Sequence, residues 1–254
     1  MAPDSRGKVV AIIQARMGST RLPGKSLMPL AGRALVYRVL ERIKRAETLD
    51  QIILAIPDSV ENHVLAEIAE ELGVDCFLGS EEDVLDRYYQ AGLSAGAQYI
   101  VRIPADNPTS EPAEIDKVVR HHLGLGRAGF STNLAEIRNS GYPDGIGAEI
   151  FDFSLLQESW SKNFDGRQRE HVHLNFYDYT TDIAVDENWC PISTLMCPPE
   201  YARPDLVLDI NTPDQYQYFE KMYGDLYPKN PNFGIIDIIE WHDSGRGSNQ
   251  GSLL

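Results

Sequence analysis

Glycines and cations are concentrated in one short segment near the N-terminus. Residues 14–25 contain Gly18 and Gly24 together with Arg16, Arg21 and Lys25. Glycines let backbone N–H groups approach a ligand closely, and the cations supply positive charge, so the segment predicts a phosphate-binding loop. A nucleoside triphosphate carries roughly four negative charges, so several cations and a metal ion are expected to hold it.

Two common phosphate-binding motifs do not fit this loop. Five residues separate Gly18 from Gly24, Ser19 stands where a Walker loop would need its first glycine, and Pro29 would interrupt the helix that should follow Lys25. The dinucleotide motif G-x-G-x-x-G is also missing from the loop. The alternative without a ligand is a basic surface turn.

An aspartate ends a second buried segment halfway along the chain. The run Arg102-Ile-Pro-Ala-Asp106-Asn107-Pro108 closes an expected strand with a carboxylate. Mg²⁺ is a hard cation that prefers oxygen ligands, so Asp106 is a candidate metal ligand. The alternative is a helix N-cap or turn residue.

The glycine-rich loop carries a family signature. The run AIIQARMGSTRLPGK from Ala11 to Lys25 closely resembles the opening of the cytidylyltransferase family, which includes the CMP-Kdo and acylneuraminate synthetases, and especially its spore-coat-polysaccharide-type branch. The resemblance extends over roughly residues 8–222. It implies a Rossmann-like, three-layer α/β/α nucleotidyltransferase fold of the GT-A-like type. It further implies Mg²⁺-dependent transfer of CMP from CTP to an acidic acceptor such as a sugar acid, with release of pyrophosphate, in surface polysaccharide biosynthesis.

The resemblance also implies the metal ligands. Asp106 matches the aspartate that holds the nucleotide's Mg²⁺. In the later run LDINTPD, Asn211 stands where the family has a second metal-binding aspartate, and Asp209 lies two residues earlier. Either side chain offers an oxygen to a hard cation. Capping of the following helix by Asn211 or Thr212 is the alternative.

Roles for other side chains follow from the same resemblance. The catalytic candidates are Arg16, Lys25 and Asp106. The nucleotide-binding candidates are Gln14, Ala15, Arg16, Gly18, Ser19, Arg21, Lys25, Ser80 and Arg87. The acceptor-binding candidates are Tyr142, Asp144, Glu149 and His171. Besides Asn211, two positions depart from the family pattern: Asn107 replaces a common cysteine, and Gly147 replaces an acid.

Alternating strand and helix patterns must position these residues. Short apolar runs alternate with segments of helical periodicity, which predicts an α/β fold with a mostly parallel sheet between helices. Ligands in such sheets bind at the carboxyl ends of the strands, where the loops after Gln14 and Ile103 both lie. The expected strands are 8–14, 51–56, 74–78, 98–103, 129–132, 148–153, 179–185 and 206–210. The expected helices are 34–45, 58–72 (with Asp58 or Ser59 as N-cap), 82–95, 111–123, 167–176 and 213–222.

The domain organisation follows from the same patterns. We expect one nucleotidyltransferase domain over residues 1–242, in which the part from about residue 133 forms the acceptor and dimerisation region. Relatives with this signature commonly dimerise, so a homodimer is expected. A disordered tail is expected from Asp243, because it is rich in Gly, Ser, Asn and Gln.

Charge and composition exclude several classes of protein. The 254 residues carry a net charge of −15, which would repel nucleic acid and anionic membranes. No apolar run approaches the roughly 20 residues of a membrane-spanning helix, and no apolar signal region precedes Lys8, so a cytoplasmic protein is expected. Cys76, Cys190 and Cys197 have no spacing typical of zinc, and a disulfide framework is not expected.

Several other polar residues are interpreted as structural. Arg38, Arg42, Lys44 and Arg45 are expected on a solvated helix face. His121 and His122 are expected at an exposed helix end without a role. His173, two residues after His171, does not share a helix face with it, so the pair is not interpreted as a metal site.

Three alternative functions keep the same fold. A glycosyltransferase would bind a nucleotide sugar, but Asp106 is not part of the usual Asp-x-Asp motif. A cytidylyltransferase acting on a phosphate or phosphonate acceptor is the second alternative. A non-catalytic nucleotide-binding partner, suggested by Asn107, Gly147 and Asn211, is the third.

Overall fold

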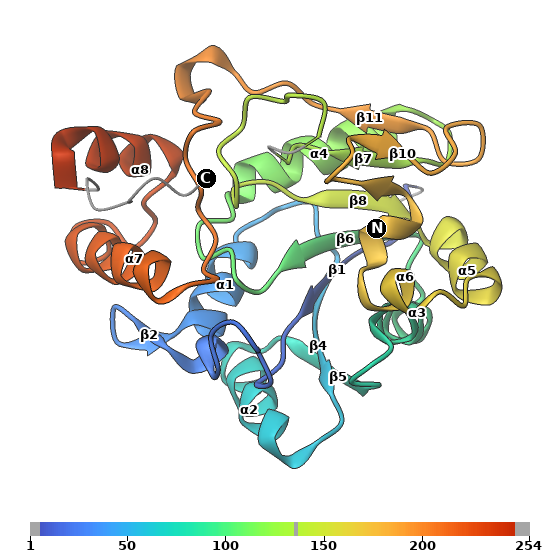
Figure 1. The fold of residues 1–254 in the computed structure, drawn as a ribbon, viewed down its shortest axis with the longest axis horizontal. Coiled ribbons are helices and arrows are strands. Elements are labelled where there is room, and N and C mark those ends of the chain that lie inside the picture. The colour runs from blue at the N-terminus through green and yellow to red at the C-terminus, as the bar shows by residue number, and fades with distance from the viewer. Residues whose placement is uncertain (1–5, 135–136, 247–254) are drawn as a thin grey trace, which may run out of the picture.

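Seven strands form one central sheet in the computed structural model, which describes residues 6–134 and 137–246 (Figure 1). In spatial order they are β11 (Ile192–Thr194), β7 (Phe130–Thr132), β8 (Glu149–Asp152), β6 (Tyr99–Pro104), β1 (Val9–Gln14), β4 (Gln51–Pro57) and β5 (Asp75–Gly79).

The sheet is mostly parallel, as the sequence predicts. Strands β6, β1, β4 and β5 run parallel to one another, and β8 is antiparallel to both β6 and β7. Strand β11 pairs in parallel with β7. Two antiparallel pairs lie outside the sheet: β2 (Pro29–Leu30) with β3 (Arg33–Ala34), and β9 (Tyr177–Asp178) with β10 (Ile183–Ala184).

Helices cover both faces of the sheet. On one face lie α1 (Leu35–Ile43), α2 (His63–Leu72), α4 (Pro112–Gly124), α7 (Pro213–Leu226) and α8 (Ile235–Trp241). On the other lie α3 (Val84–Ala95), α5 (Phe153–Lys162) and the short α6 (Gly166–Glu170). Single turns of 3₁₀ helix occupy 25–27, 60–62, 172–175 and 199–201.

Strand β1 is buried on both sides. Its residues alternate between the two cores: Val9 and Ile13 pack under α1 and α4, whereas Val10 and Ile12 pack under α3. A strand covered on both faces needs an unbroken apolar run, which is what the sequence has here. The loops that follow β1 and β6 therefore leave the sheet at the same edge.

Local capping sets where several helices begin and end. Asp83 caps α3 by accepting a hydrogen bond from the Asp86 amide, and Gly73 ends α2 at φ 62°. Thr212 and Gln215 form a reciprocal capping box at the start of α7. The expected helix 58–72 is divided, because a 3₁₀ turn with Ser59 as its N-cap precedes α2.

Two segments do not form the expected strands. Residues 179–185 belong to a short hairpin rather than one strand, because β10 folds back onto β9. Residues 206–210 form only an isolated bridge, between Val207 and Asp144. The helical segment 167–176 is interrupted at His171, which separates α6 from a 3₁₀ turn.

The prediction that Arg38 and Arg42 lie on a solvated face of α1 is wrong. Arg38 and Arg42 are 3% and 2% exposed. Arg38 donates to the carbonyl of Leu30, and Arg42 donates to the carbonyls of Ser110 and Phe233. These guanidinium groups are buried because loop carbonyls need donors. Lys44 is exposed and Arg45 is half-buried.

His122 is also buried rather than exposed. Its Nδ1 lies 2.8 Å from Ser131 Oγ and its Nε2 lies 3.2 Å from Asp152 Oδ2. This Ser-His-Asp arrangement connects α4 to β7 and β8. The Ser131 side chain is fully buried, so no substrate reaches it.

The chain end differs from the expected disordered tail. Residues 243–246 belong to a final helical turn, His242–Arg246, and Asp243 pairs with Arg203 at 2.7 Å. Residues 247–254 lie outside the described residues. The single-domain interpretation of residues 1–242 stays a prediction.

Candidate active site

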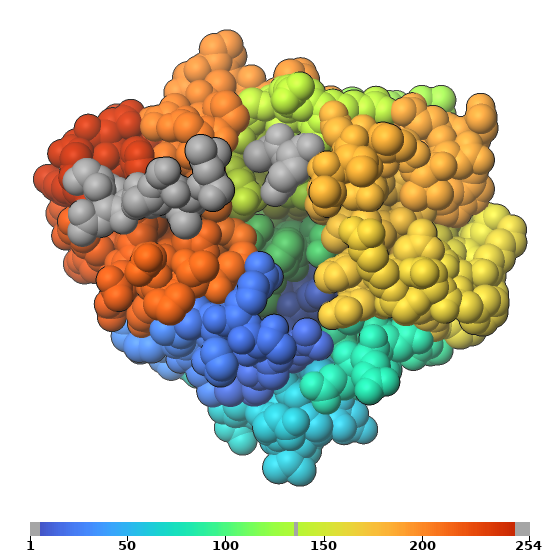
Figure 2. Space-filling view, in the orientation of Figure 1, coloured from blue at the N-terminus to red at the C-terminus, as the bar shows by residue number. Residues whose placement is uncertain are grey.

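A cleft of about 270 Å³ opens at the carboxyl ends of β1 and β6. Figure 2 shows it as the hollow between the blue N-terminal loop, the green β6 segment and the yellow α6 region. Its lining residues are Gln14, Ala15, Arg16, Ser19, Thr20, Arg21, Lys25, Ser26, Val84, Arg87, Arg102, Pro104, Ala105, Asp106, Glu170 and His171.

The glycine-rich loop and the mid-chain aspartate meet in this cleft. The Lys25 ammonium lies 2.7 Å from Asp106 Oδ2, and the two side chains are 15% and 22% exposed. The same ammonium donates to the Ile210 carbonyl at 2.9 Å and to Asn211 Oδ1 at 3.2 Å. Three oxygen atoms from two distant segments therefore surround one positive charge.

Backbone contacts hold this cluster in place. Gly24, at φ 70°, turns the chain into the 3₁₀ helix that begins at Lys25. The Ile210 amide donates to the Asp106 carbonyl at 3.0 Å. The Gln215 side chain accepts hydrogen bonds from the Asn211 and Thr212 amides at 2.7 and 2.9 Å. The capping of α7 and the placement of Asn211 thus share one loop.

Asp209 faces different partners from Asn211. Its carboxylate accepts a hydrogen bond from the Asn211 side-chain amide and another, at 3.0 Å, from Gln215 Nε2. Asn211 Oδ1, in contrast, points to Lys25 beside Asp106. Of the two candidate second ligands, Asn211 is the one with an oxygen in the cluster.

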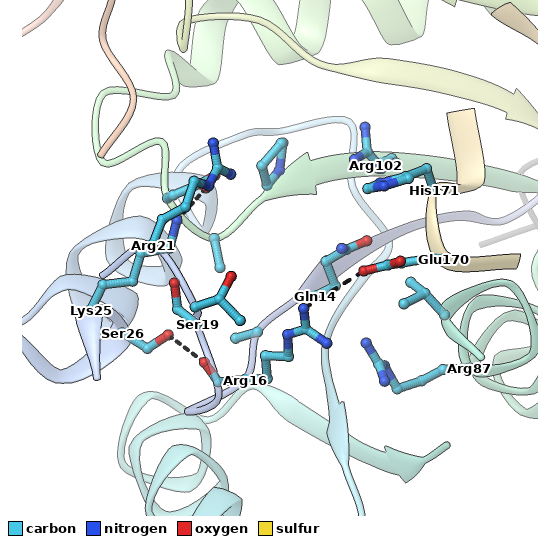
Figure 3. A pocket seen from close by; sticks show the side chains of 16 residues that line it. Gln14, Arg16, Ser19, Arg21, Lys25, Ser26, Arg87, Arg102, Glu170 and His171 are labelled. Carbon is cyan, nitrogen blue, oxygen red and sulfur yellow. Dashed lines mark hydrogen bonds and ion pairs between the residues drawn. The ribbon is translucent and has the colours of Figure 1, made fainter. Parts of the chain in front are cut away.

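The remainder of the loop spans the floor of the cleft. Arg16 reaches across to Glu170 of α6 at 3.8 Å, and its carbonyl accepts a hydrogen bond from Ser26 Oγ at 3.2 Å (Figure 3). Ser19 and Arg21 line the cleft, and Gly18 does not. An added Cβ at Gly18 would meet Glu81 Oε1 at 3.5 Å, which is ordinary contact.

Arg87 lines the cleft from α3. It is 2% exposed, and its Nη1 donates to the Ser80 carbonyl. Burial lowers the pKa of Arg87, and the charge on Arg16 lowers it further. Ser80 does not line the cleft; its hydroxyl accepts a hydrogen bond from the Asp83 amide at 3.0 Å. Ser80 thus supports Arg87 through its carbonyl.

Arg102 is a cleft residue for which no role is predicted from the sequence. It projects from β6, and its Nη1 lies 2.8 Å from Glu149 Oε2. Burial is the largest single influence and opposes its charge, but Glu149, Tyr88 and Asp106 together outweigh burial and raise the pKa of Arg102 above its ordinary value. A signal was present in the sequence: an arginine stands in an otherwise apolar strand four residues before Asp106.

The acceptor candidates are divided between the cleft and the core. His171 lines the cleft. Tyr142 is 1% exposed and donates its hydroxyl to Glu114 at 2.7 Å, so it does not face the cleft. Asp144 is bridged to Val207 through the backbone. Glu149 is buried and bound to Arg102.

The structure shows the surroundings of two residues, Gly147 and Asn107, that depart from the family pattern. An added Cβ at Gly147 would lie 2.5 Å from the Asn133 carbonyl oxygen, so this loop has no room for an acidic side chain. Asn107 is 5% exposed and begins a turn in which its carbonyl accepts a hydrogen bond from the Ser110 hydroxyl at 3.0 Å.

His173 lies behind the cleft. Its ring stacks on Tyr179 with centroids 4.1 Å apart. Burial, followed by the nearby charges of Arg102 and His171, lowers the pKa of His173 to about 2. A permanently neutral ring packed on an aromatic residue fits the structural interpretation.

The oxygen atoms around the Lys25 ammonium are ligands of the kind that a hard cation prefers. Within residues 6–134 and 137–246, no three His, Cys, Asp or Glu side chains cluster as a complete metal cage. Mg²⁺ is usually held by one or two carboxylates, with substrate phosphates and water supplying the other oxygens. Asp106 and Asn211, which already enclose a cation, fit that mode of binding.

A mostly parallel sheet with a cationic loop and an acid at its carboxyl edge defines a nucleotidyltransferase. Residues 10–187, more than half of the chain, match the family described as Cytidylyltransferase. The chain belongs to this family and is a cytidylyltransferase, which confirms the resemblance found in the sequence.

Three relatives cover most of the chain. An uncharacterized protein of Methanocaldococcus jannaschii is 35% identical over 93% of this chain and 90% of its own length. The spore coat polysaccharide biosynthesis protein SpsF of Bacillus subtilis is 29% identical over 85% and 86%. A 3-deoxy-manno-octulosonate cytidylyltransferase of Desulfatibacillum aliphaticivorans is 30% identical over 70% and 77%.

A solved structure agrees with the fold. A cytidylyltransferase from Leptospira borgpetersenii superposes with a TM-score of 0.84 at 28% identity, covering 98% of this chain and all of that one. Across the described part of the chain, no helix is both long and apolar enough to cross a membrane. Cys76, Cys190 and Cys197 are free thiols. The expected homodimer stays a prediction.

Proposed function

We propose that this enzyme transfers CMP from CTP to the oxygen of an acidic sugar, with Mg²⁺ as cofactor and pyrophosphate as the second product. The observation that carries the proposal is the 2.7 Å contact between Lys25 and Asp106. It places a cationic phosphate loop and a metal-binding type of carboxylate in one cleft, where a metal-bound triphosphate needs both.

The loop residues have the chemistry to hold the triphosphate. Arg16, Arg21 and Lys25 are cations of one loop that lines the cleft. Held in fixed positions, they stabilise the negative charge that develops on departing pyrophosphate. Arg87 and Gln14 also line the cleft, and they would contact the rest of the nucleotide.

Mg²⁺ would be held through Asp106 and Asn211. When bound, it would neutralise phosphate charge and orient the α-phosphate for in-line attack. Lys25 now holds the two side chains together, and its charge would serve the phosphates once they arrive. The chain's residues need only bind and orient the reactants, because phosphoryl transfer depends mainly on positioning and electrostatics.

The acceptor side of the proposal is supported by two relatives. One of them is a 3-deoxy-manno-octulosonate cytidylyltransferase, and another is a spore coat polysaccharide biosynthesis protein. We therefore propose a sugar acid as acceptor and surface polysaccharide biosynthesis as the pathway. We further propose that the reaction takes place in the cytoplasm, the compartment expected from the sequence.

Pyrophosphate release tests this function directly. The wild-type protein is mixed with each of the four nucleoside triphosphates and with 3-deoxy-manno-octulosonate, an acylneuraminate or a phosphate monoester, with Mg²⁺ or with EDTA. We expect release from CTP with a sugar acid and Mg²⁺ only. Release with the phosphate monoester alone would refute the sugar-acid assignment, and undiminished release in EDTA would refute the metal requirement.

A matched pair of variants tests the site. Asp106→Asn is expected to abolish release while the protein stays folded. Asp75→Asn changes a carboxylate on β5 that accepts a hydrogen bond from Gln51 at 2.7 Å, outside the cleft, and is expected to retain activity. Normal turnover of Asp106→Asn would contradict the assigned role. Transfer of sugar from a nucleotide sugar, without pyrophosphate, would favour a glycosyltransferase.

A further inference from the structure

Buried polar atoms without partners gather at one part of the cleft. Among the described residues, Gln14 Oε1, Arg87 Nε and Arg102 Nε are buried and make no hydrogen bond, and all three side chains line the cleft. Native proteins leave few such atoms unsatisfied because each one loses its bonds to water. Three of them around a single cleft indicate groups kept for a ligand.

Arg102 is held rigidly among them. Glu149 binds its Nη1 at 2.8 Å, and the Tyr88 hydroxyl lies beside its side chain. Tyr88 is itself fixed, because its hydroxyl donates to the Ile12 carbonyl at 3.1 Å. The Arg102 side chain is 11% exposed. A guanidinium with one edge bound by protein offers its remaining N–H groups in a fixed direction.

The position of Arg102 separates it from the phosphate loop. Figure 3 shows Arg102 and His171 on the side of the cleft opposite Arg21 and Lys25. Both His171 and Arg102 lower the pKa of His173, which shows that the two side chains lie near the same ring. An attacking acceptor must approach the α-phosphate from the side opposite the leaving pyrophosphate. An acidic acceptor entering this protein of net charge −15 needs a cation there.

We infer that Arg102 binds the anionic group of the acceptor and makes the enzyme specific for acids. For a sugar acid that group is the carboxylate, which would accept hydrogen bonds from the N–H groups of Arg102 that Glu149 does not bind. Glu149 and Tyr88 are positioning residues that hold the guanidinium. The inference rests on the proposed function and specifies which cation selects the acceptor.

The test compares an acid with its neutral ester. The single variant Arg102→Gln leaves the buried Glu149 carboxylate without its arginine and is at risk of misfolding. The double variant R102Q/E149Q removes both charges and lets the two amides pair. The substrates are 3-deoxy-manno-octulosonate and its methyl ester, each titrated at saturating CTP, and CTP titrated at saturating acid.

The expected result is a selective loss of acid recognition. In R102Q/E149Q, KM for the acid should rise at least about ten-fold, while KM for CTP stays within about two-fold. The ratio of kcat/KM for acid over ester should fall by about ten-fold or more. The control R120Q/E47Q removes a surface pair 3.3 Å apart, between Arg120 of α4 and Glu47 of the segment after α1, and should change none of these values. A purely structural role of Arg102 would not change the acid-to-ester ratio.

Binding measurements separate this inference from the proposed function. Calorimetry measures the binding of CTP, and of the acid in the presence of a non-hydrolysable CTP analogue, to the wild type and to the double variant. If the double variant loses as much affinity for CTP as for the acid, Arg102 belongs to the nucleotide site and the inference is overturned. An unchanged acid-to-ester ratio of kcat/KM would also overturn it. Wild-type binding of the acid that depends on Arg102, without pyrophosphate release, would support the inference while refuting the proposed function.

Discussion

Replacing Lys25 by methionine tests the cluster at the centre of the cleft. The substitution keeps the length of the side chain and removes the ammonium that Asp106, Ile210 and Asn211 share. Removing one preorganised group that stabilises transition-state charge costs roughly 10²–10³-fold in kcat, or about 3–4 kcal/mol. We therefore expect turnover to fall by that factor, because the loop would lose a cation beside the reacting phosphate.

The same contact sets the expected cost in stability. Two unit charges 2.7 Å apart attract by about 6 kcal/mol at an effective dielectric constant near 20. Desolvation offsets most of this attraction, and the partly exposed Asp106 regains water when the ammonium is removed. The net loss in unfolding free energy should lie between the values for exposed and buried pairs, at about 1–2 kcal/mol. The melting temperature should fall by roughly 2–6 °C.

The assay measures pyrophosphate release from CTP with Mg²⁺ and 3-deoxy-manno-octulosonate, beside a thermal melt of each protein. Lys162→Met is the matched control, because Lys162 pairs with Glu158 at 2.5 Å on the surface of α5. The control should keep wild-type activity. Turnover of Lys25→Met within about ten-fold of wild type, in a protein that melts normally, would refute the reasoning about this cluster.

Three further predictions concern stability. Gly147→Asp should lower the unfolding free energy by about 2 kcal/mol or more, since its Cβ would press on the Asn133 carbonyl. Arg42→Met should cost about 2–4 kcal/mol, because two buried carbonyls lose their donor. His173 is neutral in the folded protein down to about pH 2 and takes up a proton in the unfolded chain below its ordinary pKa of 6.5. Acid therefore favours unfolding, and between pH 6.5 and 4.5 the wild type should lose about 2–3 kcal/mol more than His173→Phe.

Chemical denaturation of each variant measures these effects. Wild-type stability of Gly147→Asp would show that the loop adapts to a side chain. An Arg42→Met protein as stable as the wild type would mean that water or another donor replaces the guanidinium. Parallel pH profiles for His173→Phe and the wild type would show that the ring is not kept neutral by burial.

The local patterns predict the parts of the fold that are built from continuous sequence. The apolar run at 9–13 predicts β1, since a short run rich in β-branched residues and followed by a glycine-rich loop favours a strand buried on both faces. The glycine-rich loop and Asp106 follow two such strands, so the meeting of Lys25 with Asp106 can be inferred from topology. Each strand and its following loop are encoded by residues close together in sequence, and the parallel topology then brings the two loops to one edge.

Features created by distant segments are not predicted. Strand β11 has three residues and exists because β7 lies beside it. Residues 206–210 alternate like a strand, but their partners are loop atoms of Asp144 and Asp106. Arg42 is buried because the carbonyls of Ser110 and Phe233, both far along the chain, accept its hydrogen bonds. No local pattern contains these contacts.

The same limit applies to the site. Arg102 stands in the sequence as an unexplained cation, and its partner Glu149 comes from a strand that runs in the opposite direction. Tyr142 matches a family motif, yet its hydroxyl turns into the core towards Glu114. A motif identifies the loop that borders a site, but the direction of each side chain depends on the packing behind it.

The oxygen ring around Lys25 also limits how this catalytic unit can be shortened. The family match ends at residue 187, whereas Ile210 and Asn211, which complete the ring, lie beyond it. A protein cut at that boundary would keep the signature loop and the mid-chain acid. It would lose β11, α7 and α8, and of the three contacts of the Lys25 ammonium only the one with Asp106 would remain. Moving residues 10–187 into another scaffold would therefore transfer the signature loop and Asp106 without the oxygen atoms of Ile210 and Asn211.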